Sequence, residues 1–110
     1  MGSTENLEVQ SLLIEALQGL LDSRIGIVEA ARAISRACFA LRQDKNPLFI
    51  PFIRIDSETD KFPVGKVREL WAAEALAHYD QERALTEQRY SSLAMQSATA
   101  LLDWARSQEY

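Results

Sequence analysis

Cysteine and histidine are scarce in this chain of 110 residues, which has one of each, Cys38 and His78. A single cysteine cannot form an intramolecular disulfide, and it cannot supply a cysteine cluster for zinc. A single histidine cannot complete a zinc site with Cys38 alone, and a catalytic base needs a partner that orients it. The sequence therefore predicts no resident cofactor and no active site built on histidine.

Long apolar runs, basic clusters and targeting segments are also missing. No stretch approaches the roughly 20 apolar residues that cross a bilayer, and the N-terminus lacks the basic and apolar regions of a signal peptide. The net charge is −4 and the bases are scattered, whereas nucleic-acid binding needs a basic face. We expect a cytoplasmic protein that binds neither membranes nor nucleic acids.

Recognisable catalytic motifs are absent as well. The sequence has no G-x-S-x-G nucleophile elbow, no phosphate-binding P-loop and no G-x-G-x-x-G dinucleotide fingerprint. None of the serines at 35, 57, 91 and 92 has an evident activating histidine. We therefore predict a protein that is not an enzyme.

The residues that are abundant favour helices. Leu, Ala, Glu, Arg and Gln dominate, and these residues have high helix propensity. The length suits one domain, so we predict a single all-α domain, a small helical bundle over residues 1–110. An apolar stripe at helical spacing predicts a core-facing helix over about 26–41, and its members are Ile27, Ala31, Ile34, Cys38 and Leu41.

The order of the predicted elements defines the rest of the fold. A first helix over about 4–21 is joined to the second by a short link, which predicts an antiparallel helical hairpin. A helical turn and an extended, buried segment follow over 48–55, because Pro51 disfavours helical angles at Ile50. We then expect an irregular acidic loop, a short helix near 66–71 and a long helix over about 73–106, with 91–92 as a candidate break.

The acidic loop at 56–60 is the main candidate site. Its carboxylates, Asp56, Glu58 and Asp60, alternate as the first ligands of a calcium loop do. Lys61 stands where that loop needs glycine, which excludes this type of calcium site. A looser Mg²⁺ or Mn²⁺ site, or a small-molecule site that also uses Arg68 and Trp71, remains an alternative.

A structural role for the same carboxylates competes with these functional ones. Arginines on the predicted second helix and near the loop are natural ion-pair partners, and they are Arg32, Arg36, Arg54 and Arg68. Perturbed carboxylates are often structural. Trp71 likewise fits a core position beside a stacked Arg68.

One segment also supports a resemblance. The run Ile55-Asp56-Ser57-Glu58-Thr59-Asp60, then Pro63, Gly65, Arg68, Trp71, Glu74-Ala75-Leu76 and Asp80, resembles an uncharacterised family of small bacterial all-helical proteins. The resemblance covers about a quarter of the chain. It implies a bacterial origin and an all-helical fold, and it brings no activity with it.

These observations favour a module that binds another protein. The small size, the acidic balance and the lack of catalytic groups suit an immunity or antitoxin-like protein that neutralises a basic toxin. The alternative is a small-molecule or divalent-metal binding protein that uses the loop at 56–60. A third hypothesis is homo-oligomerisation through the long helix, with Leu101, Leu102 and Trp104 as contacts.

Overall fold

Helices make up 77% of the residues that the computed structural model describes, which confirms the all-α prediction. The structure describes residues 4–109; positions 1–3 and 110 of the predicted domain lie outside the described residues. Within 4–109 no strand occurs. The elements in chain order are α1 (Thr4–Leu21), α2 (Ile27–Ala40), α3 (Ile50–Glu58), the 3₁₀ helix η1 (Gly65–Leu70) and α4 (Ala73–Ser107).

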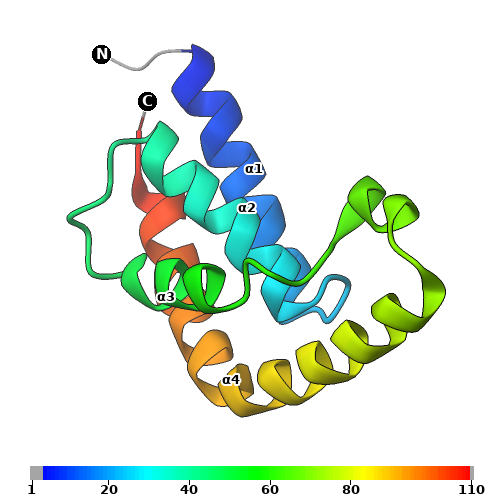
Figure 1. The fold of residues 1–110 in the computed structure, drawn as a ribbon. Coiled ribbons are helices and arrows are strands. Elements are labelled where there is room, and N and C mark those ends of the chain that lie inside the picture. Colours follow the sequence, from blue (N-terminus) through cyan, green and yellow to red (C-terminus); the bar gives the residue numbers. More distant parts are fainter. Residues whose placement is uncertain (1–3, 110) are drawn as a thin grey trace.

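Helices α1 and α2 form the predicted antiparallel hairpin (Figure 1). The predicted stripe of α2 is buried along its whole length, from Ile27 to Leu41. The link between the helices is tight, because the amides of Arg24 and Ile25 both donate to the carbonyl oxygen of Gly19, at 2.8 and 3.2 Å. A Cβ atom at Gly19 would lie 3.3 Å from Ile25 Cγ1. Glycine at this position therefore lets the link fold back against α1.

Helix α3 corrects the prediction that a helical turn and an extended segment occupy 48–55. Pro51 lies in the first turn of this helix, where a missing N–H and a fixed φ do no harm. The preceding turn is capped by Asn46, whose Oδ1 accepts a hydrogen bond from Leu48 N at 3.0 Å. Phe49, Phe52 and Ile55 recur at helical spacing and are all buried. Burial of these three side chains thus explains why the segment is helical, although the proline within it favoured an extended conformation.

The irregular segment consequently begins later than predicted. Because α3 continues to Glu58, Asp56 and Glu58 belong to a helix, and Asp60 lies in the turn that follows. The short helix predicted near 66–71 is η1.

The long helix α4 is continuous through the candidate break at 91–92 and curves near its middle (Figure 1). Its second half packs against α1 and α3, and it buries Ala94, Ala98 and Ala105. Leu101 and Leu102 are also buried, and Trp104 meets Phe49 edge to face with ring centroids 5.6 Å apart. Leu101 and Leu102 therefore belong to the core, and Trp104 is half-buried against it. Homo-oligomerisation through the long helix stays a prediction.

The first half of α4 is built differently. None of its side chains from 73 to 93 is fully buried, and six of the nine half-buried ones form a mostly polar stripe. That stripe follows the helical period, and its members are Leu76, Tyr79, Asp80, Arg83, Glu87 and Tyr90. No helix within residues 4–109 is long and apolar enough to span a membrane.

Phe52 tests the assignment of α3 to the core. Its side chain is fully buried between α3 and the hairpin. We expect Phe52→Ala to lower the free energy of unfolding by about 3–5 kcal/mol, through lost burial and the cavity left behind. Leu70→Ala is the control, because Leu70 is 84% exposed and should change stability by less than about 0.5 kcal/mol. Urea unfolding followed by circular dichroism measures both, and a small effect at Phe52 would contradict the assignment.

Candidate functional site

The three predicted acidic residues do not converge. Asp56 is half-buried in α3, with Oδ1 3.8 Å from Nε of Arg32 on α2. Glu58 and Asp60 are exposed, and within residues 4–109 their side chains form neither hydrogen bond nor ion pair. These residues therefore form no shared pocket.

Arg32 supplies the structural tie that the sequence predicts for this region. Its Nη2 atom donates to the carbonyl oxygen of Thr59 at 2.6 Å and to that of Phe62 at 2.5 Å. These carbonyls follow the last turn of α3, where backbone acceptors lack helical partners. Arg32 thus holds the end of α3 and the next turn against α2, and Asp56 completes the arrangement.

Arg68 and Trp71 belong to a different cluster. The Arg68 guanidinium donates two parallel hydrogen bonds to Asp80 on α4, each 2.7 Å long, and a third to the Pro63 carbonyl at 3.1 Å. Trp71 packs edge to face on Tyr79, with ring centroids 5.2 Å apart. It is half-buried rather than core. The expected stacking of Arg68 on Trp71 is replaced by the pairing of Arg68 with Asp80.

Electrostatics at the Arg68–Asp80 pair follow from this geometry. The hydrogen bonds from Arg68 lower the pKa of Asp80, with a further contribution from the positive charges of Arg68 and Arg83. The same contact raises the pKa of Arg68. Charge-assisted bidentate pairs of this kind fix geometry as well as charge. The pair therefore locks η1 onto the first half of α4.

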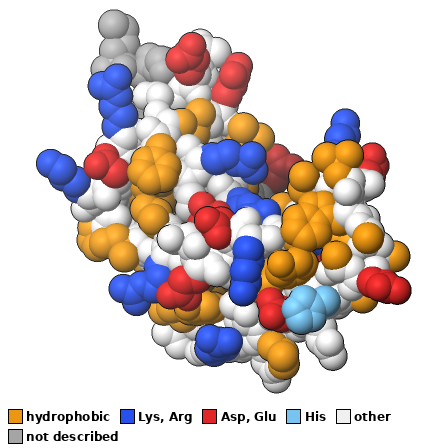
Figure 2. Space-filling model, in the orientation of Figure 1, with side chains coloured by type: hydrophobic (Ala, Val, Ile, Leu, Met, Phe, Trp, Pro, Cys, Tyr) orange, Lys and Arg blue, Asp and Glu red, His pale blue; other side chains and the backbone are white. Residues whose placement is uncertain are grey.

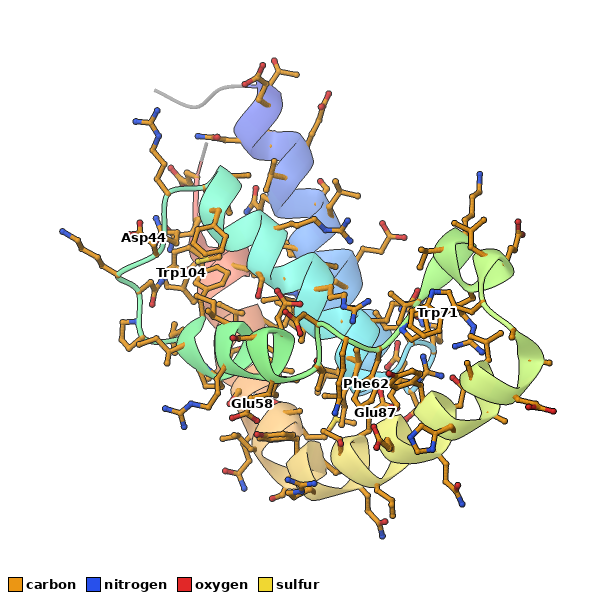
Figure 3. The ribbon with its side chains drawn as sticks, viewed as in Figure 1. Asp44, Glu58, Phe62, Trp71, Glu87 and Trp104 are labelled. Atoms are coloured by element: carbon orange, nitrogen blue, oxygen red, sulfur yellow. The ribbon has the colours of Figure 1, made fainter. Side chains whose placement is uncertain are left out.

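The five predicted site residues are consequently split between two places. Figure 3 shows Trp71 with Phe62 and Glu87 on one side of the molecule, while Glu58 lies on α3. In the part of the chain that the structure describes, no group of three or more His, Cys, Asp or Glu is placed to hold a metal ion. His78 is exposed, with Nε2 3.4 Å from Oε1 of Glu82.

Sequence reasoning missed the role of Glu87. Its Oε2 accepts a hydrogen bond from Val28 N at 3.0 Å, in the first turn of α2, where amides lack intrahelical acceptors. The N-cap residue of α2 is Gly26, which has no side chain to offer. A Cβ atom there would lie 2.6 Å from Glu87 Oε2. Glycine thus leaves room for a cap supplied by α4.

Glu87 ends a line of charges along the inner side of α4. Arg83 lies between Asp80 and Glu87, with Nη2 3.6 Å from Asp80 Oδ1 and Nε 3.9 Å from Glu87 Oε1. Spacings of three and four residues place these side chains on one helix face. That spacing is visible in the sequence, but the partners on α2 and η1 are not. The line connects η1 through α4 to the start of α2.

A groove lies between α1 and α2. Its volume is about 580 Å³. The lining is mostly apolar and small, and comprises Val9, Leu12, Ala16, Gly19, Ile25, Ala33, Ala37 and Ala40, with Glu15, Arg24, Glu29 and Arg36 among them. The hollow exists because alanine and glycine leave space where larger residues would fill the gap between two helices.

The rim of the groove carries a large exposed side chain. Leu12 lines the groove and is 64% exposed. Phe39, on the neighbouring side of α2, is 60% exposed. Single exposed apolar residues are common, but one beside an apolar hollow is characteristic of a binding surface. Sequence reasoning did not identify this groove.

Comparison with protein-family models, with curated proteins and with solved structures found no match. The resemblance to small bacterial helical proteins therefore stays a prediction. Two positions of the quoted segment, Arg68 and Asp80, are the residues of the bidentate pair, so part of that segment serves the fold.

The Arg68–Asp80 pair predicts an acid-dependent loss of stability. Because folding lowers the pKa of Asp80, its contribution is present above the unfolded pKa of about 3.9 and is lost as pH falls through the folded pKa. We expect Asp80→Asn to be less stable than the parent at pH 7, with the difference disappearing under more acidic conditions. Urea unfolding across a pH series measures this. Asp103→Asn, at an exposed position, is the control, and an identical pH response of the two variants would contradict the prediction.

The Glu87 cap predicts a second effect on stability. Glu87→Ala removes the acceptor of Val28 N, which should cost about 1 kcal/mol, as losses of helix caps do. Glu87→Gln keeps an acceptor oxygen and should cost less. Gln88→Ala changes an exposed neighbour and serves as the control. Chemical denaturation ranks the variants, and equal stability of Glu87→Ala and Gln88→Ala would show that the cap is unimportant.

Proposed function

We propose that this protein is a non-enzymatic protein-binding module and that its binding site is the groove between α1 and α2. The observation that carries the proposal is the apolar groove itself, with Leu12 exposed on its rim. Extended apolar grooves between helices are sites where amphipathic segments of partners bind. Exposed apolar surface of this kind is stabilised when a partner removes it from water.

The chemistry of the groove favours a protein over a metabolite. Of its twelve lining residues, eight are apolar, and the charged ones lie at separate positions along the two helices. Small-molecule sites instead place a few polar groups so that they converge on one ligand. An elongated apolar surface with scattered charges suits a peptide segment, whose side chains are equally spread out.

The acidic character of the chain supports a basic partner. With a net charge of −4, the protein attracts basic surfaces at long range and so raises the rate of association. An immunity or antitoxin-like protein that covers a basic bacterial toxin in the cytoplasm combines these properties. A standard interface needs only about 800 Å² from each partner, which is a small share of the 6976 Å² surface of this chain.

The alternative at 56–60 is less well supported, because within residues 4–109 Glu58 is the one member of its five candidate residues that lines a hollow, a space of about 470 Å³ beside α3. Asp56 is engaged with Arg32, and Arg68 is engaged with Asp80. Glu58 and Asp60 remain exposed. A small-molecule or metal site at these residues would need them to rearrange, so we place the function at the groove.

Filling the groove tests the proposal. Ala33 is half-buried in the groove lining, so Ala33→Trp should occupy the hollow with little effect on the core. We expect the tagged wild-type protein to capture a partner from bacterial lysate and Ala33→Trp to lose it. Mass spectrometry identifies and quantifies the captured protein.

Ala84→Trp is the matched control, because Ala84 is exposed on α4 and lies outside the groove lining. Thermal melts of both variants check that the fold survives. Equal capture by Ala33→Trp and by the wild-type protein would place the binding site elsewhere.

A further inference from the structure

We infer that the groove binds an amphipathic helix whose flank facing α1 carries Lys or Arg, an inference that rests on the proposed function and specifies the partner. Three features carry it: the length of the groove, the size of the residues in its floor, and the charges beside it.

The dimensions of the groove match a short helix. Its α1 wall extends from Val9 to Gly19, which is about 15 Å at 1.5 Å per residue. That length accommodates about three turns of a partner helix. Anchors at positions i, i+4 and i+7 of such a helix all point toward the same groove.

The floor of the groove determines which anchors fit. Ala16, Gly19, Ala33 and Ala37 have side chains of one carbon or none, so the floor is open to large side chains from outside. Leu, Ile or Phe anchors would occupy this space and bury their apolar surface. Small floor residues also permit a third helix to approach closely.

The charges beside the groove define the flanks of the partner. Glu8, Leu12 and Glu15 share one stripe of α1, and no Lys or Arg occurs in the first 23 residues. On the α2 side, Glu29 and Arg36 line the groove. Figure 2 shows acidic and basic side chains around hydrophobic ones over α1 and α2.

These charges are available to a partner. Within residues 4–109, Glu8, Glu15, Glu29 and Arg36 form neither ion pair nor side-chain hydrogen bond. Arg24 is already paired with Asp22 at 3.4 Å. The unpaired groups are thus three carboxylates against one guanidinium, a surplus of two negative charges. Complementarity therefore requires bases on the partner, above all on the side facing α1.

The same charges disfavour a second copy of this chain. In a symmetric dimer the groove of one copy would face the groove of the other. The unpaired charges in and beside each groove have the same negative surplus, so the dimer would bring like charges together. A basic helix from another protein satisfies both the shape and the charge.

Two synthetic peptides test the inference. Each is an amphipathic helix of about 18 residues, or five turns, with the same Leu anchors. One has Lys on its flanks and the other has Glu. Fluorescence anisotropy measures their binding to the wild-type protein, to Ala33→Trp and to two double variants.

The first double variant, Glu8→Lys with Glu15→Lys, reverses the charge beside the groove. The second, Glu69→Lys with Glu74→Lys, makes the same change in net charge at exposed positions outside the groove lining. Comparison of the two separates local complementarity from the overall charge of the protein.

We expect the Lys peptide to bind the wild-type protein more tightly than the Glu peptide does. Glu8→Lys with Glu15→Lys should weaken the Lys peptide on the order of tenfold, since two surface charge contacts are reversed. Glu69→Lys with Glu74→Lys should weaken it less than about twofold, and Ala33→Trp should abolish binding.

Other outcomes would overturn the inference. Equal binding of the two peptides, or equal weakening by the two double variants, would remove the role of the charges beside the groove. A wild-type dimer that Ala33→Trp dissociates in sedimentation would replace the basic helix by a second copy. If lysate capture depends on the groove but the Lys peptide does not bind, the partner chemistry is wrong while the proposed function stands. If Ala33→Trp changes neither capture nor peptide binding, the proposed function fails as well.

Discussion

The packing of α2 on three sides is the constraint on which the rest of the structure depends. Eight of its fourteen residues are buried, and it contacts α1, α3 and α4. Those contacts bury more than half of the residues of the helix. The remaining stripe, which includes Glu29, Ala33, Arg36 and Ala40, is therefore the part of α2 that is free to line a groove. Its small and charged residues cannot support another layer of core, and so the surface left over by packing is the surface proposed for binding.

A second set of contacts, polar rather than apolar, positions the first half of α4. Glu87 caps α2, and Asp80 holds Arg68. Tyr79 adds ring contacts with Phe62 and Trp71. Pairs with such geometry give orientation more than stability, because desolvation offsets much of their attraction. The protein thus combines an apolar core under α1, α2 and α3 with a polar attachment at the start of α4.

The fold was more predictable from the sequence than the site was, and particular residues show why. The stripe from Ile27 to Leu41 is local, so its period alone located α2 and its buried face. Helix α3 was missed because Pro51 indicates a break unless it lies in a first turn, which only the burial of Phe52 and Ile55 decides. The pairing of Glu87 with Val28 joins residues 59 positions apart, and no local pattern encodes it. The groove is a space between helices, and its shape is determined by how they pack. Its alanines have the pattern of ordinary helix formers, so the sequence did not predict it.

The contrast between the two halves of α4 has a consequence for how the molecule comes apart. The second half shares the buried core, whereas residues 73–93 contribute no fully buried side chain to it. Local opening requires free energy in proportion to the buried contacts it breaks. The first half of α4 and η1 can therefore detach together at lower cost than global unfolding, while the hairpin and α3 remain assembled. The chain therefore has two cooperative units of different stability. The groove belongs to the more stable unit, which contains the hairpin, and so it persists when η1 and the first half of α4 open.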